Sequence, residues 1–358
     1  MNSKDYIQWL SENSLLEKTR FNVTLFKRIF KECLGASNEN VLIITDNGYD
    51  SRRTAPIVAG SYYMAAQELG LKTNLVLQSD KTAVDNAGNN VTDALNEIDE
   101  GGIMILCVSN KLGKITKISK TFRGYVRKKN QKFISSTSLG TIHDSNLDVF
   151  LRAIDINYDK LQERQAKVKE LLDDAEILHV RTKAGTDLEI KIKDKRAVSN
   201  DGNYTTPGVG GNIPCGEVYV PPMGKNGVNG KVVIDTSSRN IEGTLLIKEP
   251  ITLEIEKGRI VDIRDGRAAD LLDQSLEDGE KRAKHPENVR LLGEFGIGMN
   301  PNARIIGSTL LDEKVMGTAH VAIGSNTWFG GDIKTIVHFD QVFMKPEITL
   351  DGKILTVM

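Results

Sequence analysis

Five side chains that can bind metal ions lie in the last two-fifths of the 358-residue chain. Two of them, His338 and Asp340, are two residues apart. On a β-strand such side chains leave the same face, so one ion could contact both. The others lie within or beside apolar, strand-like sequence, where an unpaired charge would be costly. The pattern indicates a metal site made by Glu217, Glu294, His320, His338 and Asp340.

Composition and charge narrow the class of protein. Charged residues make up 27% of the chain and hydrophobic residues 39%, which is typical of a folded, non-membrane protein. The net charge of −1 provides no global field to recruit nucleic acid or an anionic membrane, so we expect neither as a partner. The N-terminus lacks a signal-peptide pattern, and no apolar run approaches about 18 residues.

The cysteines indicate the compartment. Cys33, Cys107 and Cys215 are widely spaced and odd in number, which argues against a disulfide framework and against a cysteine-based zinc site. We therefore expect a cytoplasmic protein.

The first part of the chain alternates short apolar runs with helical patterns. The runs are typical of strands buried on both faces of a parallel sheet. We expect an α/β domain over 1–176, with strands at 41–45, 73–77, 103–108 and 132–135 and helices at 54–69 and 161–175. Segment 46–50 has no phosphate-binding glycine pattern, so a turn explains it better than a nucleotide site.

From residue 177 apolar and polar residues alternate, which is typical of half-buried strands. We expect a β-rich α+β domain over 177–358 that carries the metal ligands. The predicted elements are a hairpin at 178–182 and 188–192, strands at 230–236, 243–247, 251–255 and 258–263, and a helix at 268–284. The glycine-rich segment 208–212 has no following helix, so we expect it to form a flexible wall beside Glu217.

Several segments carry a resemblance to a known family. Residues 212–222 contain N-x-P-x-G-E-V and resemble a segment of the thermophilic aminopeptidases, the aminopeptidase T-like leucyl aminopeptidases. Segments 292–301, 311–324 and 336–340 look like three consecutive motifs of that family, in its order, and 345–352 resembles its C-terminal end. The resemblance extends from about 210 to 352.

That resemblance implies a metal-dependent aminopeptidase that removes N-terminal residues from short peptides, and a homodimer. It also implies two divalent ions, cobalt or zinc, bound by Glu217, Glu294, His320, His338 and Asp340. Carboxylates can bridge two cations and imidazoles supply nitrogen ligands, so the residue types agree with this role. Such ions would acidify a shared water and polarise the scissile carbonyl.

The chain departs from the family at two places. Thr327 stands where the larger peptidases have a tyrosine, so a phenol that could stabilise the oxyanion is missing; Asn326 or the indole N–H of Trp328 are the other donors at hand. The interval from Glu313 to His320 is two residues longer than in those enzymes. Glu313 is therefore a candidate general base, or a carboxylate that caps a helix or strand end.

A second hypothesis comes from a related branch, which is similar to mononuclear Fe(II) dioxygenases that open dihydroxypyridine rings. His338 and Asp340 would supply two ligands, and His320 or His285 the third. The presence of both Glu217 and Glu294 favours two ions. A third hypothesis is a metal-binding relative without activity.

Overall fold

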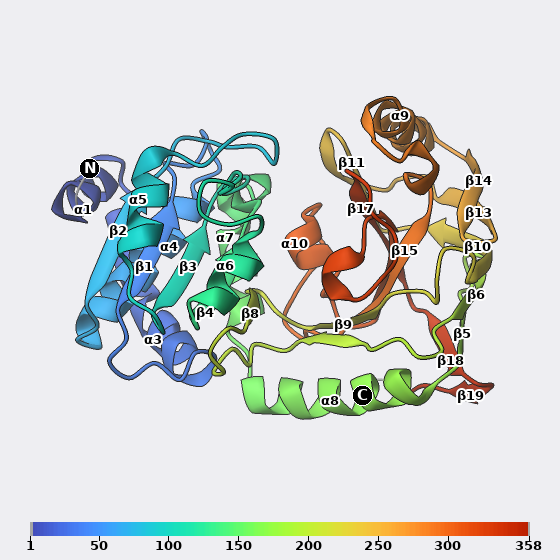
Figure 1. Ribbon diagram of the computed structural model, residues 1–358, viewed down its shortest axis with the longest axis horizontal. Helices are drawn as coiled ribbons and strands as arrows, with labels where there is room; N and C mark the ends of the chain where they lie inside the picture. Colours follow the sequence, from blue (N-terminus) through green and yellow to red (C-terminus); the bar gives the residue numbers. More distant parts are fainter. Residues whose placement is uncertain (1–2, 357–358) are drawn as a thin grey trace. The chain divides into compact units, whose positions relative to one another are not determined.

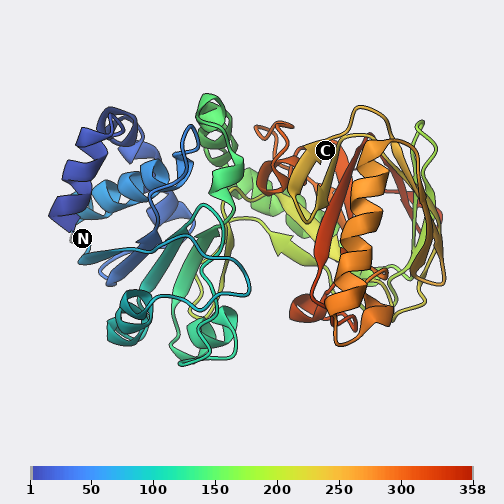
Figure 2. The same cartoon turned by 90° about the horizontal axis from the view of Figure 1, so that it is seen from above.

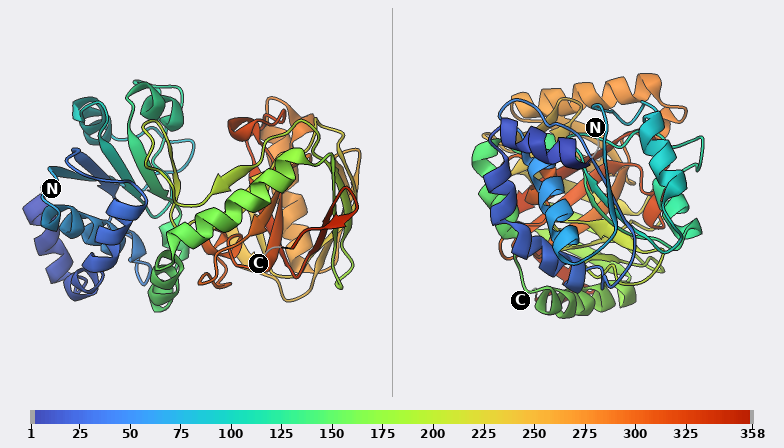
Figure 3. Two further views of the ribbon diagram at one scale, coloured as in Figure 1. Left: turned by 90° about the horizontal axis from the view of Figure 1, so that it is seen from below. Right: turned by 90° about the vertical axis from the view of Figure 1, so that its left-hand side faces the viewer.

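The computed structural model describes residues 3–356, and the chain divides into two compact units. Unit 1 consists of Met1–Tyr158 and Gly202–Cys215; unit 2 consists of Asp159–Asp201 and Gly216–Met358. The boundary expected at 176–177 differs from this division. Helix α8 (Tyr158–Asp174) goes with unit 2, where Asp173 accepts a hydrogen bond from the Ala197 amide at 2.7 Å. It is the long green helix in the left view of Figure 3.

Unit 1 is built on a five-stranded parallel sheet in the order β2-β1-β3-β4-β8. Every residue of β1 and β3 is buried, as expected of strands that are covered on both faces. The strands are β1 (Val41–Thr45), β2 (Thr73–Leu77), β3 (Ile103–Cys107), β4 (Lys132–Ser136) and β8 (Gly210–Asn212).

The edge strand β8 corrects one prediction. Segment 208–212 is not a flexible wall beside Glu217, because Gly210–Asn212 pairs in parallel with β4 and completes the sheet of the other unit. The glycine permits this approach, since a Cβ at Gly210 would lie 2.2 Å from the Phe133 carbonyl oxygen.

Helices cover both faces of this sheet, as Figures 1 and 2 show. Helix α4 packs on β1 and β3 on one face, together with α2 and α3. On the other face a core joins Val91 and Leu95 of α5 to Leu42 and Met104 of the strands. The helices are α1 (Ser3–Glu12), α2 (Leu16–Phe21), α3 (Val23–Glu32), α4 (Thr54–Glu68), α5 (Asn89–Glu97), α6 (Phe122–Lys128) and α7 (Leu147–Ile154).

Unit 2 contains two seven-stranded antiparallel sheets. The first has the order β14-β13-β10-β6-β5-β18-β19 and the second β12-β11-β17-β16-β15-β9-β7. Strands of the first sheet are β5 (Ile177–Arg181), β6 (Asp187–Lys191), β10 (Val228–Ile234), β13 (Ile251–Glu256), β14 (Arg259–Arg264), β18 (Glu347–Leu350) and β19 (Lys353–Ile354).

The second sheet carries the predicted metal ligands. Its strands are β7 (Val198–Asn200), β9 (Glu217–Val220), β11 (Ser237–Asn240), β12 (Gly243–Leu246), β15 (Leu292–Gly298), β16 (Thr318–Gly324) and β17 (His338–Met344). Helix α9 (Arg267–Arg282), orange in Figure 2, packs on β11 and β14. Every residue of β15 and β16 is buried. The predicted class, a parallel α/β domain followed by a β-rich domain, is confirmed.

Among the described residues, 3–356, no helix has the length and apolar character needed to cross a bilayer.

Candidate metal centre

All five predicted ligands leave the same face of the second sheet of unit 2. Glu294, Ala322 and Asp340 lie opposite one another in a single cross-strand row. Two residues along β16, His320 pairs with Gly296, and Glu217 at the start of β9 pairs with Gly298. Since side chains two residues apart share a face, the register places the whole set together.

The polar atoms of these five side chains form a continuous series of short contacts. The His320 Nε2 atom lies 3.8 Å from Glu217 Oε2 and 3.4 Å from Glu294 Oε1. The His338 Nε2 atom lies 3.7 Å from Glu294 Oε2 and 3.3 Å from Asp340 Oδ1. Glu294 therefore touches both imidazoles. The role of all five side chains as metal ligands remains a prediction.

Gly296 makes room for the imidazole of His320. A Cβ at position 296 would lie 2.2 Å from both Nε2 and Cε1 of that ring. Any other residue there would displace the ring or the strand, so the glycine is part of the site's construction.

The two histidines are held differently. His338 is partly exposed, and its Nδ1 lies 3.0 Å from the Ser325 carbonyl oxygen. If Nδ1 carries the proton, that contact leaves the Nε2 lone pair directed at the carboxylates, as in histidines that bind metals. His320 is fully buried, and its Nδ1 has no hydrogen-bond partner among the described residues.

The pKa values show that the cluster has an excess of negative charge. Burial lowers the pKa of His320, but Glu294, Glu313 and Glu217 outweigh it and raise that pKa to about 9. The pKa of His338 is also about 9, because Asp340 and Glu294 outweigh burial.

The carboxylates respond to the same crowding. Burial, together with Glu217 and Asp340, raises the pKa of Glu313 to about 8 against the opposing effects of Lys314 and His320. For Asp340, His338 outweighs burial and holds the pKa well below its usual range. Of the four buried or nearly buried carboxylates, Lys314 pairs with two, Glu217 and Glu313, and Glu294 and Asp340 instead lie beside the imidazoles. The oxygen and nitrogen donors therefore fit a divalent cation, which would supply the missing positive charge.

Lys314 is the member of the site that the sequence did not reveal. Its side chain is fully buried, its Nζ lies 2.9 Å from Glu217 Oε1, and it also forms an ion pair with Glu313. Glu217, Glu313 and His320 each offer one ligand atom within 4.8 Å of the others. A lysine between Glu313 and the apolar Val315 was the only signal available in the sequence. The predicted role of Glu313 as a general base remains untested.

The other residues that the sequence suggested as ligands or as oxyanion donors lie outside this cluster or already form hydrogen bonds within the protein. The His285 Nδ1 lies 3.3 Å from Glu287 Oε1, its side chain is half-exposed, and among the described residues it forms no ion pair with the cluster; its role as a third ligand remains a prediction. The side-chain amide of Asn326 is buried; it donates to the Gly293 carbonyl at 2.8 Å and accepts from the Ile333 amide at 2.8 Å. Thr327 is exposed.

Trp328 covers one side of the site. It lies in the short 3-10 helix Thr327–Phe329, is 46% exposed, and meets the ring of His338 edge to face with centroids 4.8 Å apart. The site thus combines a charged interior with an exposed aromatic wall.

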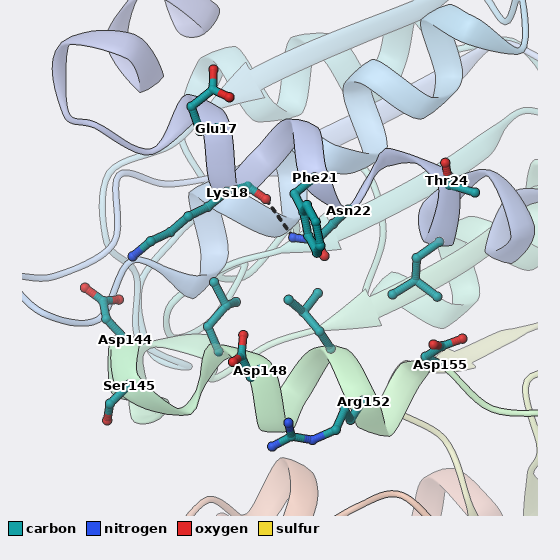
Figure 4. A pocket seen from close by; sticks show the side chains of 13 residues that line it. Glu17, Lys18, Phe21, Asn22, Thr24, Asp144, Ser145, Asp148, Arg152 and Asp155 are labelled. Carbon is teal, nitrogen blue, oxygen red and sulfur yellow. Dashed lines mark hydrogen bonds between the residues drawn. The ribbon is translucent and has the colours of Figure 1, made fainter.

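A separate hollow of about 940 Å³ lies in unit 1 among α2, α3 and α7. Figure 4 shows Lys18, Asp144 and Arg152 at its margin and Phe21 projecting into it. None of its lining residues is a histidine or cysteine, so it lacks the donor set of the centre in unit 2.

Comparison with known proteins places the chain in a family. The model of the family described as NicX, 2,5-dihydroxypyridine 5,6-dioxygenase, matches residues 22–357. The chain belongs to this family. It is 31% identical to the 2,5-dihydroxypyridine 5,6-dioxygenase of Pseudomonas putida KT2440 over 215 residues, which is 58% of the chain and 59% of that protein.

Aminopeptidases are also among the relatives. The chain is 29% identical to aminopeptidase AmpS of Bacillus subtilis 168 over 185 residues, which is 47% of the chain and 43% of that protein. The chain thus matches less than two thirds of the length of either curated relative. The expected aminopeptidase T-like family is related, but the family that matches is the NicX family.

Solved structures show the same fold. The 2,5-dihydroxypyridine dioxygenase of Pseudomonas putida KT2440 superposes with a TM-score of 0.73 at 22% identity, covering 95% of this chain and 96% of that one. AmpT of Thermus thermophilus gives 0.62 at 15% identity, covering 94% and 99%.

Proposed function

We propose that this protein is an Fe(II)-dependent dioxygenase that opens a dihydroxylated pyridine ring. The observation that carries the proposal is the pair of imidazoles, His320 and His338, held with Asp340 on one sheet face in a member of the NicX family. Two histidines and one carboxylate are the usual ligands of non-haem iron oxygenases, and they leave positions for oxygen and substrate.

When bound, Fe(II) would supply the position at which dioxygen and the hydroxylated ring are activated together. A dioxygenation adds both atoms of O₂ to the substrate, and the broken ring bond and the hydroxylated ring supply the electrons. No separate reductant is consumed, so the reaction needs no second cofactor site.

The chain's own residues prepare the site for a flat ring. Glu294 contacts both imidazoles and fixes their relative orientation, and the Ser325 carbonyl holds His338 from behind. Trp328 presents an exposed indole beside His338, on which a planar aromatic substrate could stack. A hydrogen-bonding phenol would suit a peptide oxyanion better, and Thr327 does not provide one.

A metal-dependent aminopeptidase is the second candidate. Its support is the presence of Glu217 and Glu294 in one cluster, since two carboxylates can bridge two cobalt or zinc ions, together with the similarity to AmpS. Short peptides would be its substrates. A homodimer is expected only for this aminopeptidase candidate, whereas a cytoplasmic location is expected for both candidates. The oligomeric state and the location remain proposals.

The two candidates predict different chemistry from one preparation. The metal-free protein is loaded anaerobically with Fe(II), Co(II) or Zn(II) and given either 2,5-dihydroxypyridine with ¹⁸O₂ or a panel of di- and tripeptides. We expect the Fe(II) form to consume oxygen and to place two ¹⁸O atoms in a ring-opened product. Peptide release by the cobalt or zinc form, with no oxygen consumption by the iron form, would establish the peptidase instead.

Matched variants tie the activity to the centre. His338→Ala should abolish both bound metal and turnover, since His338 contacts Glu294 and Asp340. His285→Ala should keep both, because His285 is half-exposed and pairs with Glu287. Equal behaviour of the two variants would contradict the proposed site.

A further inference from the structure

We infer that the Lys314 ammonium takes the place of a second cation and keeps a divalent ion out of the Glu217–Glu313 side of the centre. The inference rests on the proposed function, because it concerns the same site. It assigns a positive charge that is covalently part of the chain to the place where Glu217, Glu313 and His320 bring ligand atoms close enough to hold a cation.

The position of the ammonium group carries the argument. The side chain of Lys314 is fully buried, and its Nζ lies 2.9 Å from Glu217 Oε1. The same nitrogen pairs with Glu313 Oε1. It therefore joins two of the three residues that each offer a ligand atom within 4.8 Å of the others, Glu217, Glu313 and His320. A cation bound by those oxygens would have to share them with Lys314.

Charge explains why the lysine stays there. A buried ammonium is costly unless carboxylates pair with it, and a buried carboxylate is costly for the same reason. Burial would lower the pKa of Lys314, but Glu217 and Glu313 more than offset this, so the group remains charged. Lys314 thus neutralises the Glu217–Glu313 side of the cluster without a metal.

The remaining donors form a separate set. His338 contacts both Glu294 and Asp340, and among the described residues none of the three forms an ion pair with Lys314. His320 lies between the two sides, 3.4 Å from Glu294 and 3.8 Å from Glu217. One divalent ion on the His338 side is therefore enough to balance the carboxylates that the lysine does not reach.

The first test is the number of ions bound by the wild-type chain. Metal-free protein is dialysed against increasing Co(II), and bound metal per chain is measured by mass spectrometry. We expect saturation at one ion. Two tightly bound ions per chain would overturn the inference, whatever reaction the protein catalyses.

The second test removes the ammonium. Lys314→Met leaves Glu217 and Glu313 without their cation, so we expect it to bind a second Co(II) ion and to show a melting temperature that rises by several degrees as Co(II) is added, beyond any rise in the wild type. A folded Lys314→Met protein that still binds one ion would contradict the inference. The double variant Glu217→Gln/Lys314→Met removes both charges of the Glu217–Lys314 pair. We expect it to fold without added metal and to bind one ion, and a second bound ion would count against the inference.

Lys132 offers a matched control in unit 1. It is also buried and paired, with its Nζ 2.7 Å from the Leu34 carbonyl oxygen and in contact with Glu39. Lys132→Met should lower the melting temperature without changing the number of ions. If Lys132→Met also bound an additional ion, the ion gained by Lys314→Met would be explained by any buried carboxylate that loses its partner, and the inference would be contradicted. The ion count does not depend on enzyme activity. A protein that binds one ion and cleaves peptides would therefore refute the proposed function but not the inference about Lys314.

Discussion

Trp328 lies edge to face with His338, with ring centroids 4.8 Å apart and an interplanar angle of 69°. His338 is also the imidazole whose Nε2 points at Asp340 and Glu294. The indole therefore packs on one candidate ligand while almost half of its own surface stays open. This single contact connects the charged interior to the surface that a substrate would meet.

The indole should report metal binding. The chain has two tryptophans, and Trp9 lies in unit 1, stacked on Tyr6. In a Trp9→Phe background we expect Co(II) to quench the emission of Trp328, since an open-shell ion bound through His338 would provide a non-radiative route. Trp328→Phe, which leaves only Trp9, should show no quenching. Equal quenching of both proteins would place the ion elsewhere.

Trp328 should also determine how well a flat substrate binds. Loss of an aromatic stacking partner costs about 1 kcal/mol, which corresponds to a roughly fivefold weaker binding. We expect Trp328→Leu to raise KM for 2,5-dihydroxypyridine by about that factor, with little change in kcat or bound metal. Trp328→Phe should restore most of the affinity. An unchanged KM in the leucine variant would remove the indole from substrate recognition.

The parallel sheet of unit 1 could be predicted from the sequence because its strands are almost unbroken apolar runs. The predictions at 41–45 and 73–77 match β1 and β2, and the helix expected at 54–69 ends one residue later than α4. Strand β8 could not be predicted in this way. Gly210–Asn212 contains two glycines and an asparagine and therefore has no apolar side chain. Only its pairing with β4 identifies it as a strand.

The site shows the same division between local and tertiary information. The i, i+2 spacing of His338 and Asp340 predicted a shared face, and the structure places both in β17. The convergence of β9, β15 and β16 on that face depends on strand order and register, which the residues do not reveal on their own. Lys314 was missed because a lysine beside a glutamate usually indicates a solvated surface, and its burial arises only when β9 brings Glu217 to it.

Gly296 offers a test of how tightly His320 is positioned. We expect Gly296→Ala to weaken metal binding at least tenfold, because the new methyl group would lie 2.2 Å from the His320 ring. Titration with a competing chelator measures the affinity. Gly317→Ala is a suitable control: its φ of +90° makes the substitution strained, but its Cβ would have no neighbour within 4 Å. It should lower stability and leave the affinity intact, and an equal loss of affinity in both would indicate general unfolding.

Thr327 separates the two candidate reactions. If the chain were a peptidase that lacks only the phenol, Thr327→Tyr should raise peptide turnover by about 10²- to 10³-fold, since one oxyanion donor is worth that much. Under the proposed dioxygenase function we expect no peptide release before or after the substitution. Amino-acid release from a tripeptide by the cobalt and zinc forms measures this. A large gain would favour the hydrolase.

The final prediction concerns pH. In the metal-free protein the pKa values of His320 and His338 are raised from 6.5 to about 9. The stability that their protonated forms contribute is therefore fully present below pH 6.5 and lost as the pH rises to 9. Glu313, whose pKa is raised from 4.5 to about 8, acts in the same direction between those values. We expect the free energy of unfolding of the metal-free protein to fall by several kcal/mol between pH 6.5 and 9, since a shift of one pKa unit corresponds to about 1.4 kcal/mol.

Metal affinity should change in the opposite direction over the same range. An ion must displace the protons from both imidazoles, so its dissociation constant should fall by roughly ten- to a hundredfold per pH unit up to about pH 9. Calorimetry in two buffers of different ionisation enthalpy would count the protons released. His285→Ala should leave both pH profiles unchanged, since that ring pairs with Glu287 outside the centre. An affinity that does not vary between pH 6.5 and 9 would mean that the ion binds without His320 and His338.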